Sequence, residues 1–320
     1  MKLSILAPGG IANQIARAAV QLEGIECYAA ASRSSERAEA FADKWGFEKH
    51  YGSYGELAED PQAELVYVAS PHSHHYQHAK LCLEHGKHVL LEKAFTVNAA
   101  QAEELIQIAG EKGLLLAEAF WPRYMPSRNM IQKLLAQGAI GEVQSVEADF
   151  GAPLSTIERL RSPELAGGAL LDLGVYPINF ALQVFPENIE KIHSSAVLSP
   201  EGVDWMNSIT LTFEGGKMAV LHSNMLAHMK NHGTIYGDKG YLEVDSVSNC
   251  TNIRVYEGNK MTCYQVPEQI NGYEYEILAC ARAIEAGQTE CAEMPHSETV
   301  RMMRILDEAR KTWGMRFPCE

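Results

Sequence analysis

Two apolar runs that each end in polar residues constrain this chain more than any other feature. The run 64–69 ends at Ser70-Pro71, and the run 88–91 ends at Glu92-Lys93. Short apolar runs of this kind are typical of strands buried on both faces of a parallel sheet. Ligands of open parallel sheets bind beyond the carboxyl ends of the strands, so Lys93 is well placed to meet one.

The first 120 residues alternate between strand and helix signals. Strands are expected at 3–7, 25–31, 65–69, 88–91 and 114–117, and helices at 11–22, 35–45, 55–58 and 99–112. This succession predicts a parallel sheet with right-handed crossovers, forming a first domain over 1–120.

The pattern changes in residues 121–320, which we expect to form a second domain. Helices are expected at 125–137, 273–286 and 297–313, and strands at 143–150, 209–213, 217–223, 233–236, 241–244 and 253–256. Gly-rich turns between successive strands, such as the one at 214–216, are hairpin signals and predict an antiparallel sheet.

Composition excludes several classes of partner. The net charge of −14, without a basic run, argues against nucleic acid, and the longest apolar runs are far shorter than a membrane span.

Seven cysteines without a CxxC pair indicate reduced thiols and a cytoplasmic location. His72, His74, His75 and His78 cluster without an HExxH motif or a cysteine partner, so we expect no metal site.

Residues 7–12 stand where a dinucleotide fingerprint would join the first strand to the first helix. Gly9 occupies the place of the central glycine, whereas Ala7 and Ala12 replace the first and third. Candidate pyrophosphate contacts at this helix N-terminus are Gly9, Gly10, Ile11 and Ala12. Taken alone, the turn fits a cofactor site and a plain strand-to-helix turn equally well.

The end of the second strand favours NADP over NAD. An NAD site usually carries Asp or Glu there, but this chain has Ser32-Arg33, with Arg37 one helical turn further on. Arg33 can stack on adenine and pair with a 2′-phosphate, to which Ser32 can hydrogen-bond. The alternative is a solvated arginine in a surface loop.

Several motifs carry a family resemblance. The turn 9–12, the spacing from Pro71 to His75 and the segment Gly86–Lys93 are similar to the glucose–fructose oxidoreductase / inositol dehydrogenase / rhizopine-catabolism (Gfo/Idh/MocA) family. The segments 118–124 and 167–177 resemble its branch of dimeric dihydrodiol dehydrogenase and NADP-dependent D-xylose dehydrogenase. The resemblance covers essentially the whole chain.

The resemblance implies an α/β fold with two domains. An N-terminal Rossmann domain, a doubly wound parallel sheet, precedes an α+β domain with an open, mostly antiparallel sheet, whose free face commonly forms a homodimer interface. The family's Glu-Lys-Pro is here Glu92-Lys93-Ala94, which leaves the backbone after the strand open.

The resemblance also implies an NADP-dependent dehydrogenase acting on a small molecule, a sugar or a cyclic vicinal diol. Its catalytic residues would be Lys93, Tyr176 and Asp172. Tyr176 is favoured as the acid/base with Lys93 supporting it, and the reverse assignment stays open. Asp172 precedes Tyr176 by four residues and shares its face if 168–180 is helical.

The remaining candidates surround these residues. Trp121 and Arg123 are expected near the nicotinamide or the substrate, and Trp121, Phe150 and Tyr275 as pocket walls. His74 and His78 are expected at the surface. Further candidate cofactor contacts are Ser70, Pro71, His72, His75, Glu92 and Lys93.

Two other functions remain open on the same fold. One is a cofactor-binding sensor, which would not need Lys93, Asp172 and Tyr176 together. The other is an NAD-dependent glycosidase, against which Ser32-Arg33 argues.

Overall fold

The computed structural model describes all 320 residues, which divide into two compact units. The first unit comprises Met1–Tyr124 and Gln269–Val300, and the second comprises Met125–Glu268 and Arg301–Glu320. A cut at residue 120 differs from this division, because the chain returns to the first unit at residue 269. Two hydrogen bonds attach the returning segment to β6: the N–H of Leu116 donates to the carbonyl of Thr289, and the carbonyl of Leu116 lies 2.7 Å from His296 Nε2.

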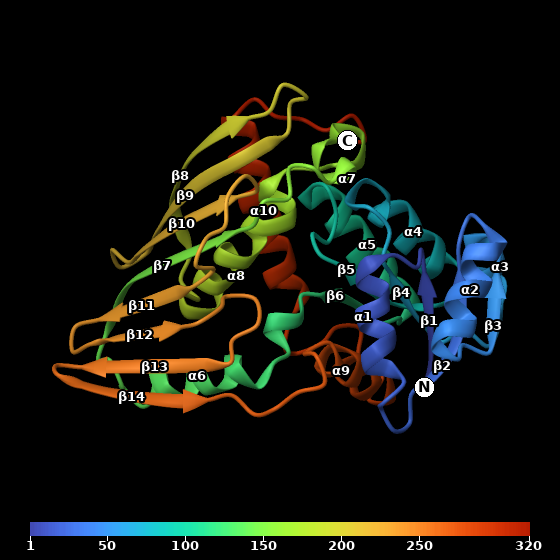
Figure 1. The fold of residues 1–320 in the computed structure, drawn as a ribbon, viewed down its shortest axis with the longest axis horizontal. Helices are drawn as coiled ribbons and strands as arrows, with labels where there is room; N and C mark the ends of the chain where they lie inside the picture. Colours follow the sequence, from blue (N-terminus) through green and yellow to red (C-terminus); the bar gives the residue numbers. More distant parts are fainter. The chain divides into compact units, whose positions relative to one another are not determined.

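The first unit contains a six-stranded parallel sheet (Figure 1). The strands are β1 (Lys2–Leu6), β2 (Glu26–Ala31), β3 (Lys49–Tyr51), β4 (Leu65–Val68), β5 (His88–Glu92) and β6 (Leu116–Ala119). Their order is β3-β2-β1-β4-β5-β6, so the winding reverses between β1 and β4, where Rossmann folds bind their ligands. The short strand β3 was not predicted, because its three residues are only partly buried or exposed and give no apolar run.

The helices of this unit follow the predicted alternation. They are α1 (Gly10–Ala19), α2 (Ser35–Trp45), α3 (Tyr54–Glu59), α4 (His72–Glu84), α5 (Ala99–Lys112), α9 (Glu274–Glu285) and a 3₁₀ turn at Trp121–Arg123. The α/β class and the doubly wound parallel sheet are confirmed.

The second unit contains an eight-stranded sheet. The strands are β7 (Val143–Gly151), β8 (Ile189–Leu198), β9 (Asp204–Phe213), β10 (Met218–Asn224), β11 (Gly233–Gly237), β12 (Tyr241–Val244), β13 (Asn252–Glu257) and β14 (Lys260–Gln265). The sheet is mostly antiparallel, as predicted, but β7 and β10 pair in parallel at its centre. The two edge strands, β8 and β14, were not predicted, because polar residues interrupt their apolar pattern.

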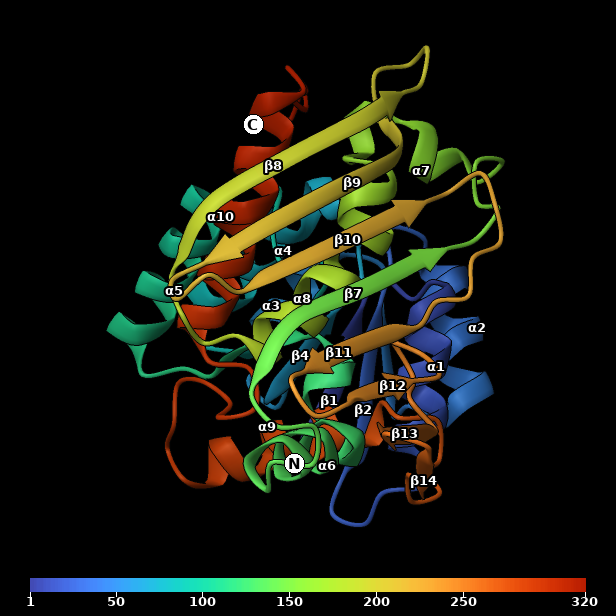
Figure 2. The same ribbon diagram turned by 90° about the vertical axis from the view of Figure 1, so that its left-hand side faces the viewer.

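Helices lie against one face of this sheet. They are α6 (Pro126–Ala136), α7 (Glu158–Arg161), a 3₁₀ turn at Pro163–Leu165, a π-helix at Leu170–Gly174, α8 (Val175–Val184) and most of α10 (His296–Thr312). In Figure 2 the sheet faces the viewer and α8 lies behind β7 and β10.

One stretch, Pro163–Val184, is long and apolar enough to cross a membrane by length and composition alone. Of its most apolar window, 94% is buried inside the protein. A helix that is apolar all round and covered by its own protein is typical of a core helix.

Candidate active site

The turn between β1 and α1 leaves the N-terminus of α1 open to a ligand. Gly9 is the N-cap residue, no side chain caps the helix there, and its first turn carries no acidic residue. Backbone N–H groups at such a helix end, together with the helix dipole, favour an anion such as a pyrophosphate. Gly10 is exposed, Ile11 is partly buried, and Ala12 is fully buried where close packing is needed.

Ala7 keeps the fingerprint conformation without the fingerprint glycine. Its φ is 65°, in the left-handed region, and its N–H donates to the carbonyl of Ala31 at 2.9 Å. Glycine adopts this region freely, whereas an alanine there is strained by roughly 1–2 kcal/mol. The missing glycine therefore weakened the sequence signal but not the turn itself.

The end of β2 presents two guanidinium groups. Ser32 is buried, and its hydroxyl accepts a hydrogen bond from the N–H of Ser34 at 3.3 Å. Ser34 caps α2 by accepting from the N–H of Arg37 at 3.3 Å. Arg33 and Arg37 are exposed, and both charges act on the hydroxyl of Tyr54, at the start of α3.

His75 connects the ends of β4 and β5. Its Nε2 lies 2.7 Å from the carbonyl oxygen of Ser70, and its Nδ1 lies 2.8 Å from that of Ala94. Burial is the main reason that the pKa of His75 falls to about 4, and the Lys93 charge contributes. Its polar atoms are thus occupied by the backbone beside Lys93, while the buried Ser70 hydroxyl has no partner. Pro71 is the N-cap residue of α4, and His72, also buried, is its first residue.

Lys93 follows β5 and is partly buried. Its backbone N–H donates to the Oε2 atom of the buried Glu92 at 3.1 Å. The hydroxyl of Tyr67, on the neighbouring strand β4, donates to the other carboxylate oxygen of Glu92. The peptide bond between Lys93 and Ala94 is cis, at the place where the family carries proline. Glu92 thus holds the backbone from which Lys93 projects.

The end of β6 carries a second buried carboxyl. Burial raises the pKa of Glu118 to about 7, against the hydrogen bond from the Thr299 hydroxyl and the charge of Arg123. Arg123 is buried and donates to Glu298 at 2.9 Å, so its guanidinium holds the segment 269–300 in place. Trp121 stacks on Tyr273 at a centroid distance of 4.5 Å.

The second unit brings together Phe150, Asp172 and Tyr176. The expected helix over 168–180 is instead a π-helix followed by α8, with Asp172 in the former and Tyr176 in the first turn of the latter. Both residues are buried, and the Tyr176 ring stacks on Phe150 at 4.7 Å. The guanidinium of Arg159 donates to Asp172 at 3.2 and 3.3 Å, a partner that sequence reasoning missed.

Asp204, on β9, anchors this segment and was also missed. Its Oδ2 accepts from the backbone N–H of Leu170 at 2.9 Å and from Asn207 at 2.8 Å. Burial raises its pKa to about 6. A Cβ on Gly168, whose φ is 111°, would lie 2.3 Å from Asp204 Oδ1, so only glycine lets the chain pass. An isolated Asp in a strand gives no sequence signal for this role.

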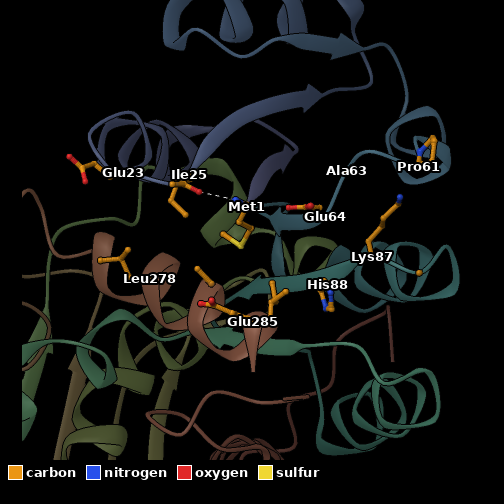
Figure 3. Close-up of a pocket in the computed structure, with 14 residues that line it drawn as sticks. Met1, Glu23, Ile25, Pro61, Ala63, Glu64, Lys87, His88, Leu278 and Glu285 are labelled. Atoms are coloured by element: carbon orange, nitrogen blue, oxygen red, sulfur yellow. Dashed lines mark hydrogen bonds between the residues drawn. The ribbon is translucent and has the colours of Figure 1, made fainter. Parts of the chain in front are cut away.

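One pocket of the first unit lies away from these residues. It measures about 590 Å³ and is lined by Met1, Ile25, Glu64 and His88, which stand at the amino ends of β1, β2, β4 and β5 (Figure 3). The candidate cofactor residues stand at the opposite, carboxyl edge of the same sheet. The pocket is therefore separate from the candidate site.

The predicted site residues are distributed over both units. Tyr275 lies on α9 of the first unit and is partly buried. No group of three or more His, Cys, Asp or Glu side chains is arranged to hold a metal ion. The carboxyl ends of β1, β2, β4 and β5 carry Gly9–Ala12, Ser32, Arg33, Arg37, Ser70–His75 and Glu92–Lys93, and the second unit carries Phe150, Asp172 and Tyr176.

Comparison with known proteins identifies both parts of the chain. Residues 5–120 match the model of an oxidoreductase family with an NAD-binding Rossmann fold, and residues 129–243 match the GFO/IDH/MocA C-terminal domain. The trans-1,2-dihydrobenzene-1,2-diol dehydrogenase of Xenopus laevis is 35% identical, over 99% of each chain. The enzyme of the same name from Danio rerio is 35% identical, over 98% of this chain and 97% of its own.

Solved structures give the same picture. A 3-ketoreductase from Actinomadura kijaniata, in complex with NADP and TDP-benzene, superposes with a TM-score of 0.88 at 28% identity, over 97% of each chain. An aldose-aldose oxidoreductase from Caulobacter crescentus shares the fold, with a TM-score of 0.87 at 22% identity over 97% of this chain and 96% of its own.

Proposed function

Because the chain belongs to the GFO/IDH/MocA oxidoreductase family and is an NAD(P)-dependent enzyme acting on CH–OH donors, we propose that it oxidises a cyclic vicinal diol or a sugar with NADP. The substrate class in this proposal rests on the full-length relatives named dihydrodiol dehydrogenases. Bound NADP would accept the hydride, and the residues of the chain would bind the substrate and move its hydroxyl proton.

The preference for NADP rests on the end of β2. Arg33 and Arg37 offer two exposed guanidinium groups and Ser32 a hydroxyl, which suits a dianionic 2′-phosphate. No acidic residue stands at Ser32 or Arg33, where an NAD site would place one for the ribose 2′-hydroxyl. The open N-terminus of α1 suits the pyrophosphate.

Three side chains are proposed to act on the substrate. Tyr176 acts as acid/base on the reacting hydroxyl, Lys93 supports it, and Asp172 binds a second hydroxyl of the substrate. The buried Asp172 is fixed by Arg159, and the Tyr176 ring is fixed by Phe150, so both are preorganised. Phe150, Trp121 and Tyr275 are the proposed apolar walls, which suit the flat face of a ring.

The open face of the eight-stranded sheet is proposed as a homodimer interface in a cytoplasmic enzyme. Met218 and Val220 on β10 are 42% and 46% exposed, while Ala219 and Leu221, which alternate with them along the strand, are buried. Exposed apolar side chains gathered on a flat sheet mark an interaction surface. Val220→Arg should shift sedimentation from dimer to monomer, and an unchanged dimer would contradict this interface.

The first experiment is a fluorescence titration with NADPH and NADH. It is followed by an absorbance screen of pentoses, hexoses, inositols and cyclic trans-diols with NADP. We expect tighter NADPH binding that collapses in Arg33→Ala but not in Arg17→Ala, a change of another exposed arginine. Preference for NADH would contradict the NADP assignment, and tight binding without turnover of any polyol would favour a sensor.

A further inference from the structure

Trp121 leaves the parallel sheet at the same edge as Lys93. The register of β5 and β6 sets Glu92 opposite Ala119, so the chain segments that follow these two neighbouring strands begin side by side. Lys93 is the first residue after β5, and Trp121 begins the 3₁₀ turn after β6 and is partly buried. The indole of Trp121 therefore belongs to the surroundings of the proposed reaction centre, within the first unit.

The ring of Tyr273 covers one face of this indole. The two rings are nearly parallel, with an interplanar angle of 2° and a centroid distance of 4.5 Å. Stacked aromatic rings attract one another beyond the area that they bury, so the stack restrains the rotation of the Trp121 side chain. A ligand can then meet the indole only at its opposite face or at its edges.

The loop that ends at Tyr273 is restrained by a buried carboxylate. The N–H groups of Ile270, Asn271 and Gly272 donate to Glu274 at 2.7, 3.2 and 2.7 Å. Glu274 is only 5% exposed, and hydrogen bonds to a carboxylate of this kind are among the stronger ones in proteins. These bonds fix the backbone from which the Tyr273 ring projects.

A second contact joins the same loop to helix α1. The side-chain amide of Asn271 donates to the carbonyl of Gln14 at 2.8 Å, and its Oδ1 accepts from the N–H of Tyr273 at 3.2 Å. Asn271 therefore sets the start of α9 against the helix whose N-terminus is proposed to bind the pyrophosphate. Tyr273 and the proposed cofactor site thus share one framework.

We propose that Tyr273 is a positioning residue for substrate selection: it holds the Trp121 indole as a flat wall, so that the enzyme prefers cyclic vicinal diols to open-chain ones. This inference rests on the proposed function. A cyclic diol lays a continuous apolar face of C–H groups against the indole, whereas an open-chain diol buries less area and loses more internal rotation on binding. A wall that is already ordered spares the ligand the cost of ordering it.

The test compares two substrates that share the vicinal diol and differ in the ring, trans-1,2-cyclohexanediol and butane-2,3-diol, with NADP and the full-length enzyme. In Tyr273→Leu, or in Tyr273→Met if the first variant does not fold, KM for the cyclic diol should rise about 2- to 10-fold with kcat nearly unchanged, because the lost contact binds ground state and transition state alike. KM for the open-chain diol should stay close to its wild-type value. For a diol that turns over too slowly, the competitive inhibition constant takes the place of KM.

Controls separate this role from misfolding and from the proposed function. Tyr273→Phe keeps the stacked ring and should keep the wild-type preference. Tyr264→Leu changes an exposed tyrosine on the edge strand β14 and should alter neither constant. The ratio of the two kcat/KM values does not depend on the fraction of enzyme that is folded.

Two outcomes overturn the inference. Equal losses for both diols in Tyr273→Leu, or an unchanged preference, would remove Tyr273 from substrate selection, while turnover by the wild type would still support the proposed function. A wild type that turns over no diol or sugar would overturn the proposed function and this inference with it.

Discussion

The two units of this protein hold their candidate site residues in different ways. In the first, Lys93 and its neighbours stand on loops at strand ends, held by Glu92 and His75 through a few hydrogen bonds to the backbone. In the second, Asp172 and Tyr176 belong to a buried helix that Asp204 anchors from a strand. Substitutions in the first unit should therefore affect function more than stability, and those in the second should affect both.

The largest effect is expected for Lys93. Lys93→Met should lower kcat/KM by about 10²–10⁴-fold, because it removes the group proposed to assist proton transfer. The melting temperature should change little, since Lys93 stands on a loop and is only partly buried. Steady-state kinetics with the best diol or sugar, together with thermal unfolding, measure both quantities.

Lys112→Met, at the exposed end of α5, is the matched control and should leave kcat/KM unchanged. A Lys93→Met enzyme with wild-type activity would remove Lys93 from the mechanism.

Asp204 tests the anchoring of the second unit. Its pKa is raised to about 6 by burial, above its unfolded value of 3.8, so the group favours the folded state below pH 3.8 and this contribution is lost as the pH rises through 6. Asparagine does not ionise, so the Asp204→Asn variant does not lose this stability as the pH rises. The unfolding free energy of the variant minus that of the wild type should rise by on the order of 3 kcal/mol between pH 4 and pH 7.

Urea unfolding at four pH values measures this difference. Asp238→Asn, in an exposed turn, should show no comparable trend. A flat difference for Asp204→Asn would mean that the buried carboxyl does not titrate in this range.

His75 tests whether the loop contacts of the first unit matter for stability. His75→Phe keeps the ring volume but removes the single N–H that the neutral imidazole donates to the carbonyl of either Ser70 or Ala94, which should cost about 2 kcal/mol of unfolding free energy. NADPH affinity should fall as well, because both carbonyls belong to the edge proposed to bind the cofactor. Unchanged stability and affinity would show that this connection is dispensable.

The smallest effect is expected at Ala7. Ala7→Gly relieves the left-handed strain and should raise the unfolding free energy by about 0.5–1 kcal/mol after the extra entropy of the unfolded glycine chain is subtracted. Ala40→Gly, on the exposed face of α2, should lower it by about 1 kcal/mol. A loss of stability in both variants would contradict the strain at Ala7.

The sequence predicted that Ser70 and Glu92-Lys93 lie at strand ends, because the relevant signals are local. An apolar run followed by Ser70 or by Glu92-Lys93 marks a strand end, and strand ends of a parallel sheet gather at one edge. The partners that fix these residues are far away in sequence. Glu298, which pairs with Arg123, lies 175 residues further along the chain, and Asp204, which accepts from Leu170, lies 34 residues further. No local sequence pattern connects such distant positions.

The sequence by itself determined the alternating first unit, the hairpins of the second and the residues at the strand ends, because the period of apolar side chains and the turn residues are properties of neighbouring positions. Only the tertiary structure decided the parallel pairing of β7 with β10, the return of residues 269–300 to the first unit, and the pairing of Arg159 with Asp172. Those features depend on which distant segments pack against one another, and local sequence patterns do not specify that packing.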